Sequence, residues 1–557
     1  MEKRPDRLGA RASIRRRDFI NGVLAGSAGA VAFRALPGCA HAGKDDSGLG
    51  TVPPAADRAD DYTNCHALRD GDSFDIPAAS GDLLDCVIIG GGPSGLMAAW
   101  MLARLGASSV LVLEKEAPAG GFCRSDTHYG SVVTRAADYT AVPETRDLID
   151  LYLDLGLVTE SGGSVTPNPD LVARSPKLRQ YIDGAWYDDP WADEAGRGIE
   201  RLPFPANVIA DLKAFRADAQ SWWDRRGSDG LWAFDLPDDA SADPEIRALD
   251  AITFAEYVAG KGWDPAVSDY LSASVQASYA LPSSELSAWV AMFELCADVW
   301  GGETDEDAGD LAATGGLAFL TEALVDKVGA DHLTTGAIVL RAVETDGEVQ
   351  ITYLSEGVTT TLRARTAIYA APRYMAPYVV PGLGDAGRDE SSAFRFTPYL
   401  VAQVFVDQTP AKLAWYNEVV SGACFLGFTV ADWHDYRDPA SAPLTRSNAL
   451  TVYMPLTEAD RPALLTTPIE DYEEAILADL ERVLPGVRDT VVAFDLYRWG
   501  HAMVAARPGF LFGAERIAAK EPLGAISFAC TDLEGIPTFE CAAASAFRAA
   551  REVAALL

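Results

Sequence analysis

The chain has 557 residues, of which 48% are hydrophobic and 23% charged, so it is long enough to bury a large core and to form more than one domain. Acidic residues outnumber basic residues by 81 to 46, which gives a formal net charge of −35 at pH 7. A surface this acidic repels phosphate backbones, so nucleic acid is not expected as a partner. The negative electrostatic potential of such a surface attracts cations. The alternative interpretation is that the acidic residues are spread over the whole surface and serve solubility.

An export signal is expected in residues 1–42. The adjacent arginines Arg15, Arg16 and Arg17 precede an uncharged run that is rich in Gly and Ala. This run is about 15 residues long, shorter than the roughly 20 residues of a membrane-spanning helix, and the pattern resembles a twin-arginine signal. We therefore expect a periplasmic or secreted protein whose N-terminal extension occupies residues 43–82.

Two cleavage patterns compete at the end of this signal. Residues 36–39 resemble a lipobox, in which Cys39 would carry a lipid and anchor the protein to a membrane. Residues 40–42 resemble an ordinary small-residue cleavage site, which would release a soluble protein. Contact with a membrane is therefore expected only if Cys39 is lipidated.

A dinucleotide-binding motif begins at residue 83. The apolar run 83–89 predicts a buried strand, residues 96–106 predict a helix, and residues 109–113 predict a second strand that ends at Glu114. The turn between the first strand and the helix reads Gly-Gly-Gly-Pro-Ser-Gly. In this arrangement the glycines allow the tight turn, the approach of a pyrophosphate and close helix packing, and the acid accepts hydrogen bonds from ribose hydroxyls. We expect cofactor contacts from Gly90, Gly92, Ser94, Gly95 and Glu114, the alternative being a purely structural glycine turn.

A second glycine pair follows Glu114. The sequence Gly120-Gly121-Phe122-Cys123-Arg124-Ser125 resembles the flavin-containing amine oxidase superfamily, in which a Gly-Gly pair lies along the pyrophosphate and flavin. The resemblance implies FAD rather than NAD as the cofactor. It also implies contacts to FAD from Gly120, Gly121 and Arg124.

Further segments match this superfamily in the required order, at residues 315–340, 367–372 and 526–532. The resemblance implies that the backbone of Val339 pairs with adenine and that Asp532 binds a ribityl hydroxyl. Thr538 suits the N-cap of the last helix, whose positive end at Phe539 would face the N1/C2 carbonyl edge of the isoalloxazine. An ordinary capped helix is the alternative interpretation.

The predicted fold class is α/β, with a Rossmann-type FAD-binding domain interleaved with a mixed α+β substrate domain, as in amine oxidases. The FAD-binding domain is expected to consist of residues 83–140, 310–375 and 490–557. The substrate domain is expected to consist of residues 141–309 and 376–489.

More narrowly, the chain resembles exported proteins of the spermidine dehydrogenase type, through the arginine-rich start and residues 65–71, 135–139 and 498–503. Some proteins of that type are reported to carry haem, but no CxxCH motif is present here. No Cys or His cluster has the spacing of metal ligands, so no metal is expected.

Four residues are candidates for catalysis or substrate binding. His501 is a candidate because histidine ordinarily titrates near neutral pH, and a histidine bonded to a backbone carbonyl beneath the flavin is an equal alternative. Trp499 could wall the substrate cavity or simply belong to the core. Asp138 and Tyr139 could meet a cationic group, but a solvated loop acid is the simpler interpretation of Asp138.

Many amine oxidases use a lysine bridged by water to the flavin, and Lys412 is poorly placed for that role. This departure from the family pattern favours a dehydrogenase with an acceptor other than oxygen, and the identity of that acceptor stays open. Oxidation of an amine or polyamine by FAD is the leading hypothesis for the small-molecule substrate. The alternatives are oxidation of a terpenoid-, porphyrin- or carotenoid-like hydrocarbon, and a non-enzymatic flavin protein for electron transfer.

Overall fold

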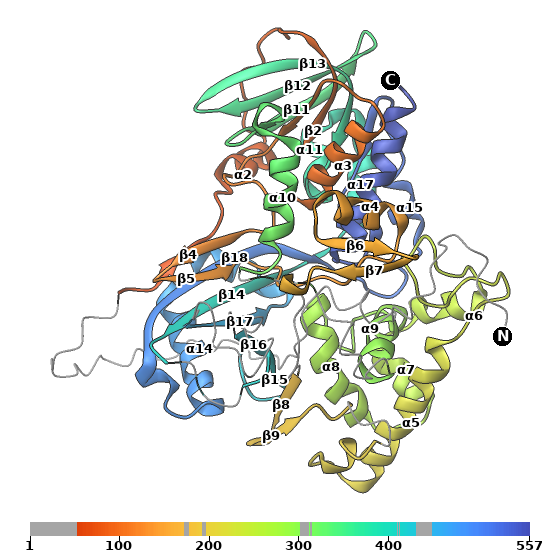
Figure 1. Ribbon diagram of the computed structural model, residues 1–557, viewed down its shortest axis with the longest axis vertical. Helices are drawn as coiled ribbons and strands as arrows, with labels where there is room; N and C mark the ends of the chain where they lie inside the picture. The colour runs from red at the N-terminus through yellow and green to blue at the C-terminus, as the bar shows by residue number, and fades with distance from the viewer. Residues whose placement is uncertain are drawn as a thin grey trace.

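The computed structural model describes residues 53–171, 178–191, 196–300, 311, 313, 315–408, 410, 413–430 and 448–557. The expected export signal, Cys39 and Lys412 lie outside these residues. The described chain forms two large sheets and a group of helices beside the second sheet (Figure 1). Among the described helices, none combines the length and apolar character needed to cross a membrane.

The first sheet contains the predicted dinucleotide motif. Its parallel strands have the order β10, β3, β2, β13, and β19 pairs with the end of β13. The first half of β13 instead pairs antiparallel with β12, which continues into β11. Both faces of this sheet are covered, which is why β2 is a nearly continuous apolar run. The strands are β10 (Leu333–Thr334), β3 (Val110–Leu113), β2 (Leu83–Ile89), β13 (Val358–Tyr369), β19 (Ile526–Phe528), β12 (Glu348–Ser355) and β11 (Ile338–Thr345).

Three helices pack together on this sheet: α3 (Pro93–Arg104), α10 (Ala318–Val328) and α17 (Phe539–Ala554). Five of the eleven buried residues of α17 are alanine, which lets the helix approach α3 closely. The hydroxyl of Ser94 at the start of α3 donates to the carbonyl of Ala542 in the first turn of α17, at 3.2 Å. The N-termini of both helices therefore lie at one edge of the sheet.

The second sheet has eight strands in the order β1, β18, β14, β17, β16, β15, β8, β9. Every residue of its four central strands β14 to β17 is buried, so this sheet is also covered on both faces. The strands are β1 (Ala56–Asp57), β18 (Val491–Val504), β14 (Phe396–Val406), β17 (Ala449–Pro455), β16 (Gly427–Val430), β15 (Tyr416–Val419), β8 (Leu178–Ile182) and β9 (Ala185–Asp188).

A helical layer packs beside the second sheet and has its own apolar core, formed by α5 (Ala206–Trp223), α7 (Phe254–Gly260), α8 (Pro265–Tyr279) and α9 (Ala288–Trp300). Other short elements lie near the site described below: α2 (Thr63–Asp70), β4 (Ser125–His128), β5 (Ser131–Thr134), α4 (Arg146–Asp154) and α16 (Thr531–Glu534). The chain passes repeatedly between the two sheets, and this confirms the predicted interleaved α/β fold.

Two segments pack in a different layer of the structure from the one predicted from the sequence. Strand β18 was expected in the FAD-binding part, but antiparallel pairing with β14 along most of its length makes it part of the second sheet. Helix α4 was expected in the substrate domain, but Leu148, Leu151 and Tyr152 pack into the apolar core shared by α3 and α17. In both cases the layer is set by contacts between residues that are distant along the chain: main-chain pairing for β18 and apolar packing for α4.

Candidate functional site

A cavity of about 1000 Å³ is lined by residues from both sheets. The carboxyl ends of the parallel strands β2, β3 and β13 reach it through Ile89, Leu113 and Tyr369. Strands β14, β17 and β18 of the second sheet form the facing wall. Ligands of open parallel sheets bind at the carboxyl ends of the strands, so this cavity is the candidate site.

The glycine turn after β2 leaves open space at the cavity. Gly90 has a φ of 110°, and a Cβ atom there would lie 2.8 Å from the carbonyl oxygen of Ala370. A Cβ atom on Gly95 would lie 1.9 Å from the oxygen of Gly90. A Cβ atom on Gly92 would have only the Cα atom of Gly121 within 4 Å, at 3.8 Å. Gly90 and Gly95 are therefore required by the turn, whereas Gly92 leaves room for a bound group.

One end of the cavity has an acid held in place by backbone N–H groups. The N–H of Gly91 donates to Oε2 of Glu114 at 2.7 Å, and the N–H of Glu116 donates to Oε1 at 2.8 Å. Val339, on β11, lines the same cavity. The cavity therefore offers the acid and, in the edge strand β11, the main-chain edge that an adenosine would need.

The middle of the cavity fits an anionic group. Arg124 is only 3% exposed, and its Nε donates to the carbonyl of Gly121 at 2.7 Å. Its Nη1 is buried and has no hydrogen-bond partner among the described residues. The hydroxyl of Thr538 accepts from the N–H of Cys541 at 3.2 Å, which confirms the predicted N-cap of α17. An unpartnered guanidinium N–H suits a phosphate of the expected FAD. The N-terminus of α17 opens onto the same cavity through Thr538 and Phe539, and its predicted contact with the isoalloxazine stays a prediction.

Asp532 lines the cavity from α16. Its Oδ2 accepts the backbone N–H of Arg373 at 2.9 Å. Burial is the largest influence on this carboxyl and raises its pKa to about 6, while the hydrogen bond from Arg373 lowers it in part. The side chain can therefore hydrogen-bond a cofactor hydroxyl in either protonation state.

Ten of the twelve residues predicted to bind the cofactor line the cavity, while Gly95 and Gly120 do not. Gly95 packs against Gly90, and the N–H of Gly120 donates to the carbonyl of Gly91 at 2.9 Å. Gly95 therefore keeps the first turn compact and Gly120 joins the second turn to the first, and neither lines the cavity. The ten are Gly90, Gly92, Ser94, Glu114, Gly121, Arg124, Val339, Asp532, Thr538 and Phe539.

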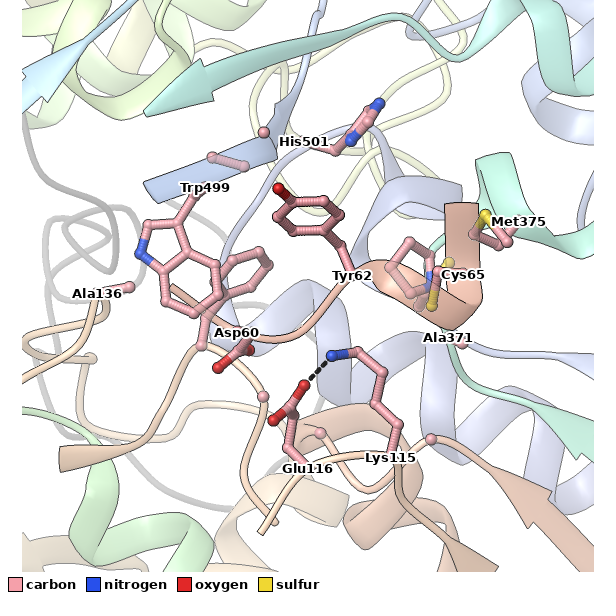
Figure 2. A pocket seen from close by; sticks show the side chains of 18 of the residues that line it. Asp60, Tyr62, Cys65, Lys115, Glu116, Ala136, Ala371, Met375, Trp499 and His501 are labelled. Carbon is pink, nitrogen blue, oxygen red and sulfur yellow. Dashed lines mark hydrogen bonds and ion pairs between the residues drawn. The ribbon is translucent and has the colours of Figure 1, made fainter. Parts of the chain in front are cut away.

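Three of the four catalytic candidates, Asp138, Trp499 and His501, line the same cavity. Figure 2 shows two of them, Trp499 and His501. The indole N–H of Trp499 donates to the carbonyl of Arg135 at 3.1 Å, which fixes the ring. Tyr139 is buried in the apolar core of the second sheet and packs edge-on against Trp415 with ring centres 4.8 Å apart. Tyr139 is therefore not among the described residues that line the cavity.

Asp138 is a buried acid and not the solvated loop acid of the simpler interpretation. It is 7% exposed, and its Oδ2 has no hydrogen-bond partner in the described part of the chain. Burial raises the pKa of this carboxyl to about 6, while the hydroxyls of Thr429 and Tyr453 lower it in part. An acid with a free oxygen on a cavity wall is poised to pair with a cationic ligand or to accept a proton.

His501 is neutral at neutral pH. Its ring stacks on Tyr374 with centres 4.1 Å apart and meets Phe396 edge-on. Burial, and secondarily the nearby charge of Arg461, lower the pKa of the imidazole to about 4. The neutral ring can offer a donor or an acceptor to a bound molecule but does not titrate near pH 7.

Sequence reasoning missed the part that residues before the first strand play in the site. Nine residues of the expected N-terminal extension line the cavity: Asp57, Ala59, Asp60, Asp61, Tyr62, Cys65, His66, Leu68 and Arg69. Figure 2 shows Tyr62 between Trp499 and His501. In the sequence, residues 65–71 carry only a family resemblance, and no motif in the segment signals a ligand.

Lys115 is the one lysine among the described residues that line the cavity, and it pairs with Glu116 beside Glu114. Within the same part of the chain, no group of three or more His, Cys, Asp or Glu residues is arranged to hold a metal ion.

Residues 93–554 match the model of the flavin-containing amine oxidoreductase family. Three solved structures share the fold. Putrescine oxidase bound to putrescine is 19% identical, with a TM-score of 0.61 over 85% of this chain and 99% of that one. Cyclohexylamine oxidase from Brevibacterium oxydans IH-35A is 20% identical, with a TM-score of 0.60 over 85% and 99%. A fatty acid isomerase from P. acnes that produces CLA is 15% identical, with a TM-score of 0.59 over 85% and 98%.

Among curated proteins, the inactive all-trans-retinol 13,14-reductase of Danio rerio is 35% identical over 105 residues. The matched part is 18% of this chain and spans only 17% of the length of that relative.

Proposed function

We propose that this protein dehydrogenates a small amine or polyamine. The chain belongs to the flavin-containing amine oxidoreductase family and is an FAD-dependent oxidoreductase. Asp138 carries the proposal, because it places a buried carboxylate with an unpartnered oxygen on the wall of the FAD cavity. A protonated amine would satisfy that oxygen, whereas an apolar substrate would leave it unpaired. The acidic surface, with a net charge of −35, also favours the approach of cations.

When bound, FAD supplies a two-electron acceptor for the hydride on the carbon next to the amine nitrogen. The ionised carboxylate of Asp138 pairs with the substrate ammonium and takes its proton, which leaves the free amine that can be oxidised. Trp499, Tyr399 and Tyr453 line the cavity and limit the access of water. Water then hydrolyses the imine product to a carbonyl compound and an amine or ammonia.

The resemblance to the spermidine dehydrogenase type supports a polyamine as the narrower substrate. Putrescine oxidase, which shares the fold, is named for an amine substrate of the same class. Lys115 is the one lysine among the described lining residues and is paired with Glu116, which supports an electron acceptor other than oxygen.

Anaerobic titration of the purified protein with polyamines, monoamines, amino acids and isoprenoids tests the substrate class. We expect polyamines or monoamines to bleach the oxidised flavin absorbance, and we expect slower recovery in air than with an artificial acceptor. Bleaching by isoprenoids alone, or by no member of the panel, would overturn the amine assignment. Free FAD with the same compounds is the control.

The second candidate substrate is an apolar isoprenoid-like hydrocarbon. The aromatic lining of the cavity, which includes Phe122 and Trp499 with ring centres 4.8 Å apart, favours it. The name of the short Danio rerio match points the same way. The titration above distinguishes the two candidates directly. A non-enzymatic role is set aside, because the family consists of oxidoreductases.

Export through the twin-arginine route is a further part of the proposal, supported by Arg15 to Arg17 and the apolar run that follows. Replacing Arg16 and Arg17 by lysine is expected to retain the protein in the cytoplasm of a producing cell, where cell fractionation would find it. Unchanged delivery to the periplasm or medium would contradict this route. The mass of the mature N-terminus then separates a lipidated Cys39 from cleavage after Ala42.

A further inference from the structure

The cavity has a wall that does not come from the residues matched by the family. Residues 56–69, called the strap from here on, precede that match and contribute nine of the lining residues. The strap runs from β1 into α2. Tyr62, on the strap, lines the cavity and lies between Trp499 and His501 (Figure 2).

One end of the strap is fixed to the second sheet. Strand β1 pairs in parallel with β18, where Ala56 lies opposite Asp495. The backbone N–H of Arg58 donates to the carbonyl of Leu496 at 2.8 Å, and its guanidinium lies 3.2 Å from the buried carboxylate of Asp495. Asp57 forms an ion pair with Arg498 at 2.7 Å.

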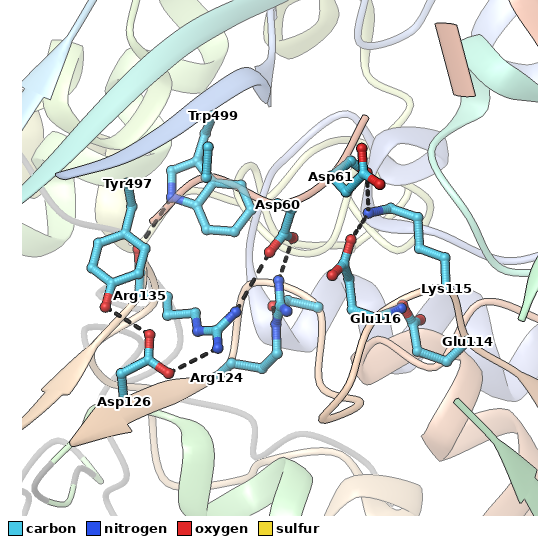
Figure 3. A network of polar contacts seen from close by, with 12 residues as sticks. Asp60, Asp61, Glu114, Lys115, Glu116, Arg124, Asp126, Arg135, Tyr497 and Trp499 are labelled. Atoms are coloured by element: carbon cyan, nitrogen blue, oxygen red, sulfur yellow. Dashed lines mark hydrogen bonds and ion pairs between the residues drawn. The ribbon is translucent and has the colours of Figure 1, made fainter. Parts of the chain in front are cut away.

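The other end of the strap is fixed to the cofactor side of the cavity (Figure 3). Asp60 accepts hydrogen bonds from Nη2 of Arg124 and from Nη1 of Arg135, the latter at 3.4 Å. The ammonium of Lys115, next to Glu114, donates to the backbone carbonyl of Asp61 at 3.3 Å. The strap therefore bridges the two sheets over the cavity.

Asp60 is the single acid that links the strap to Arg124. The guanidinium of Arg124 is fixed on one side by Gly121 and on another by Asp60, which leaves Nη1 free at the cavity. Arg135 has a second acid, Asp126, at 2.8 Å, so the loss of Asp60 affects Arg124 more strongly. Buried cations that lose their only carboxylate partner change their position or become hydrated.

We propose that the strap closes the cavity over bound FAD, and that Asp60 is a positioning residue that orients Arg124 toward the cofactor phosphates and keeps the strap in place. FAD then leaves only when the strap detaches from one of its two anchors. This inference rests on the FAD site alone and does not depend on which substrate is oxidised.

The test compares how fast FAD is released from the full-length holoenzyme and from its variants. The proteins are diluted without substrate, and the fluorescence of free FAD measures the release. We expect release from Asp60→Asn to be at least about tenfold faster than from the wild type, and release from Asp60→Glu to be intermediate. Asp72→Asn is the matched control, since Asp72 is exposed, lies just beyond the strap and does not line the cavity. Its release rate should equal that of the wild type.

Arg58→Gln provides an independent test, because it weakens the anchor at β18 without touching the cavity or Arg124. Its FAD release should be about threefold to tenfold faster, and it carries the test alone if Asp60→Asn does not fold. An unchanged release rate in Arg58→Gln would overturn the strap as a barrier to FAD. An unchanged rate in a folded Asp60→Asn variant would overturn the role of Asp60.

Discussion

Replacing Gly92 by leucine is expected to abolish FAD binding and to leave the fold intact. Gly92 has a φ of −77°, which any residue adopts, and a Cβ atom there meets no atom closer than 3.8 Å. The added side chain would occupy the space between the glycine turn and Gly121, where a pyrophosphate would lie. We expect affinity for FAD to fall at least about 100-fold, or about 2.7 kcal/mol. The ratio of flavin to protein absorbance after purification measures it.

Gly260→Leu is the control for this prediction. Gly260 ends α7 on the surface, has no neighbouring atom within 4 Å of an added Cβ, and is not among the residues that line the cavity. This variant should bind FAD fully and show a similar melting temperature. Gly95→Ala should instead impair folding, because its Cβ would lie 1.9 Å from the oxygen of Gly90. Full flavin stoichiometry in Gly92→Leu would refute the placement of FAD.

Asp138→Asn is expected to retain FAD but to lose most amine oxidation. The amide keeps the size of the side chain but removes the charge that would pair with an ammonium in a buried site. Loss of one partner of such a pair typically costs about 2 to 4 kcal/mol, so kcat/KM for amines should fall about 30-fold to 1000-fold. Steady-state kinetics with the amine that bleaches the flavin best would measure this, and a decrease below threefold would contradict the role of Asp138.

The pH dependence gives a second readout for Asp138. Burial raises the pKa of this carboxyl to about 6, so the group is neutral below that pH and ionised above it. We expect kcat/KM for amines to rise as the pH increases through about 6 and to be level above it until the substrate itself deprotonates. Asp138→Asn should lose this inflection.

His501→Gln is the matched comparison for the pH profile, since an unperturbed histidine would titrate in the same range. The pKa of His501 is about 4, so the inflection near pH 6 should persist in His501→Gln whatever its rate. Disappearance of the inflection in His501→Gln, and its persistence in Asp138→Asn, would assign the titration to the histidine.

The cofactor site could be predicted from the sequence because its signals are local. The turn around Gly92, the strand that ends at Glu114 and the N-cap at Thr538 each depend on residues that are close together along the chain. Hydrophobic patterns and glycine positions therefore identify a βαβ unit before any long-range contact is known. The same reasoning predicted the fold class, which the two sheets confirm.

The burial of Asp138 and His501 could not be predicted from the sequence, because it depends on contacts between distant segments. Asp138 lies in a loop between β5 and α4, and its sequence neighbours do not reveal that β16 and β17 supply the hydroxyls of Thr429 and Tyr453 around it. For the same reason, the sequence favoured a solvated loop acid at this position, whereas the side chain is buried. His501 lost its expected titration near neutral pH because Tyr374 and Phe396, distant in sequence, pack against it.

Residue spacing along the chain is enough to predict a dinucleotide-binding βαβ unit, and the resemblance of the second glycine pair to amine oxidases implies FAD. The tertiary structure decided that β18 belongs to the second sheet and that residues 56–69 cover the cavity. Both depend on strand pairing and ion pairs between residues such as Asp60 and Arg124, which are distant along the chain. Such contacts follow from the packing of the whole chain and leave no periodic signal in any one segment.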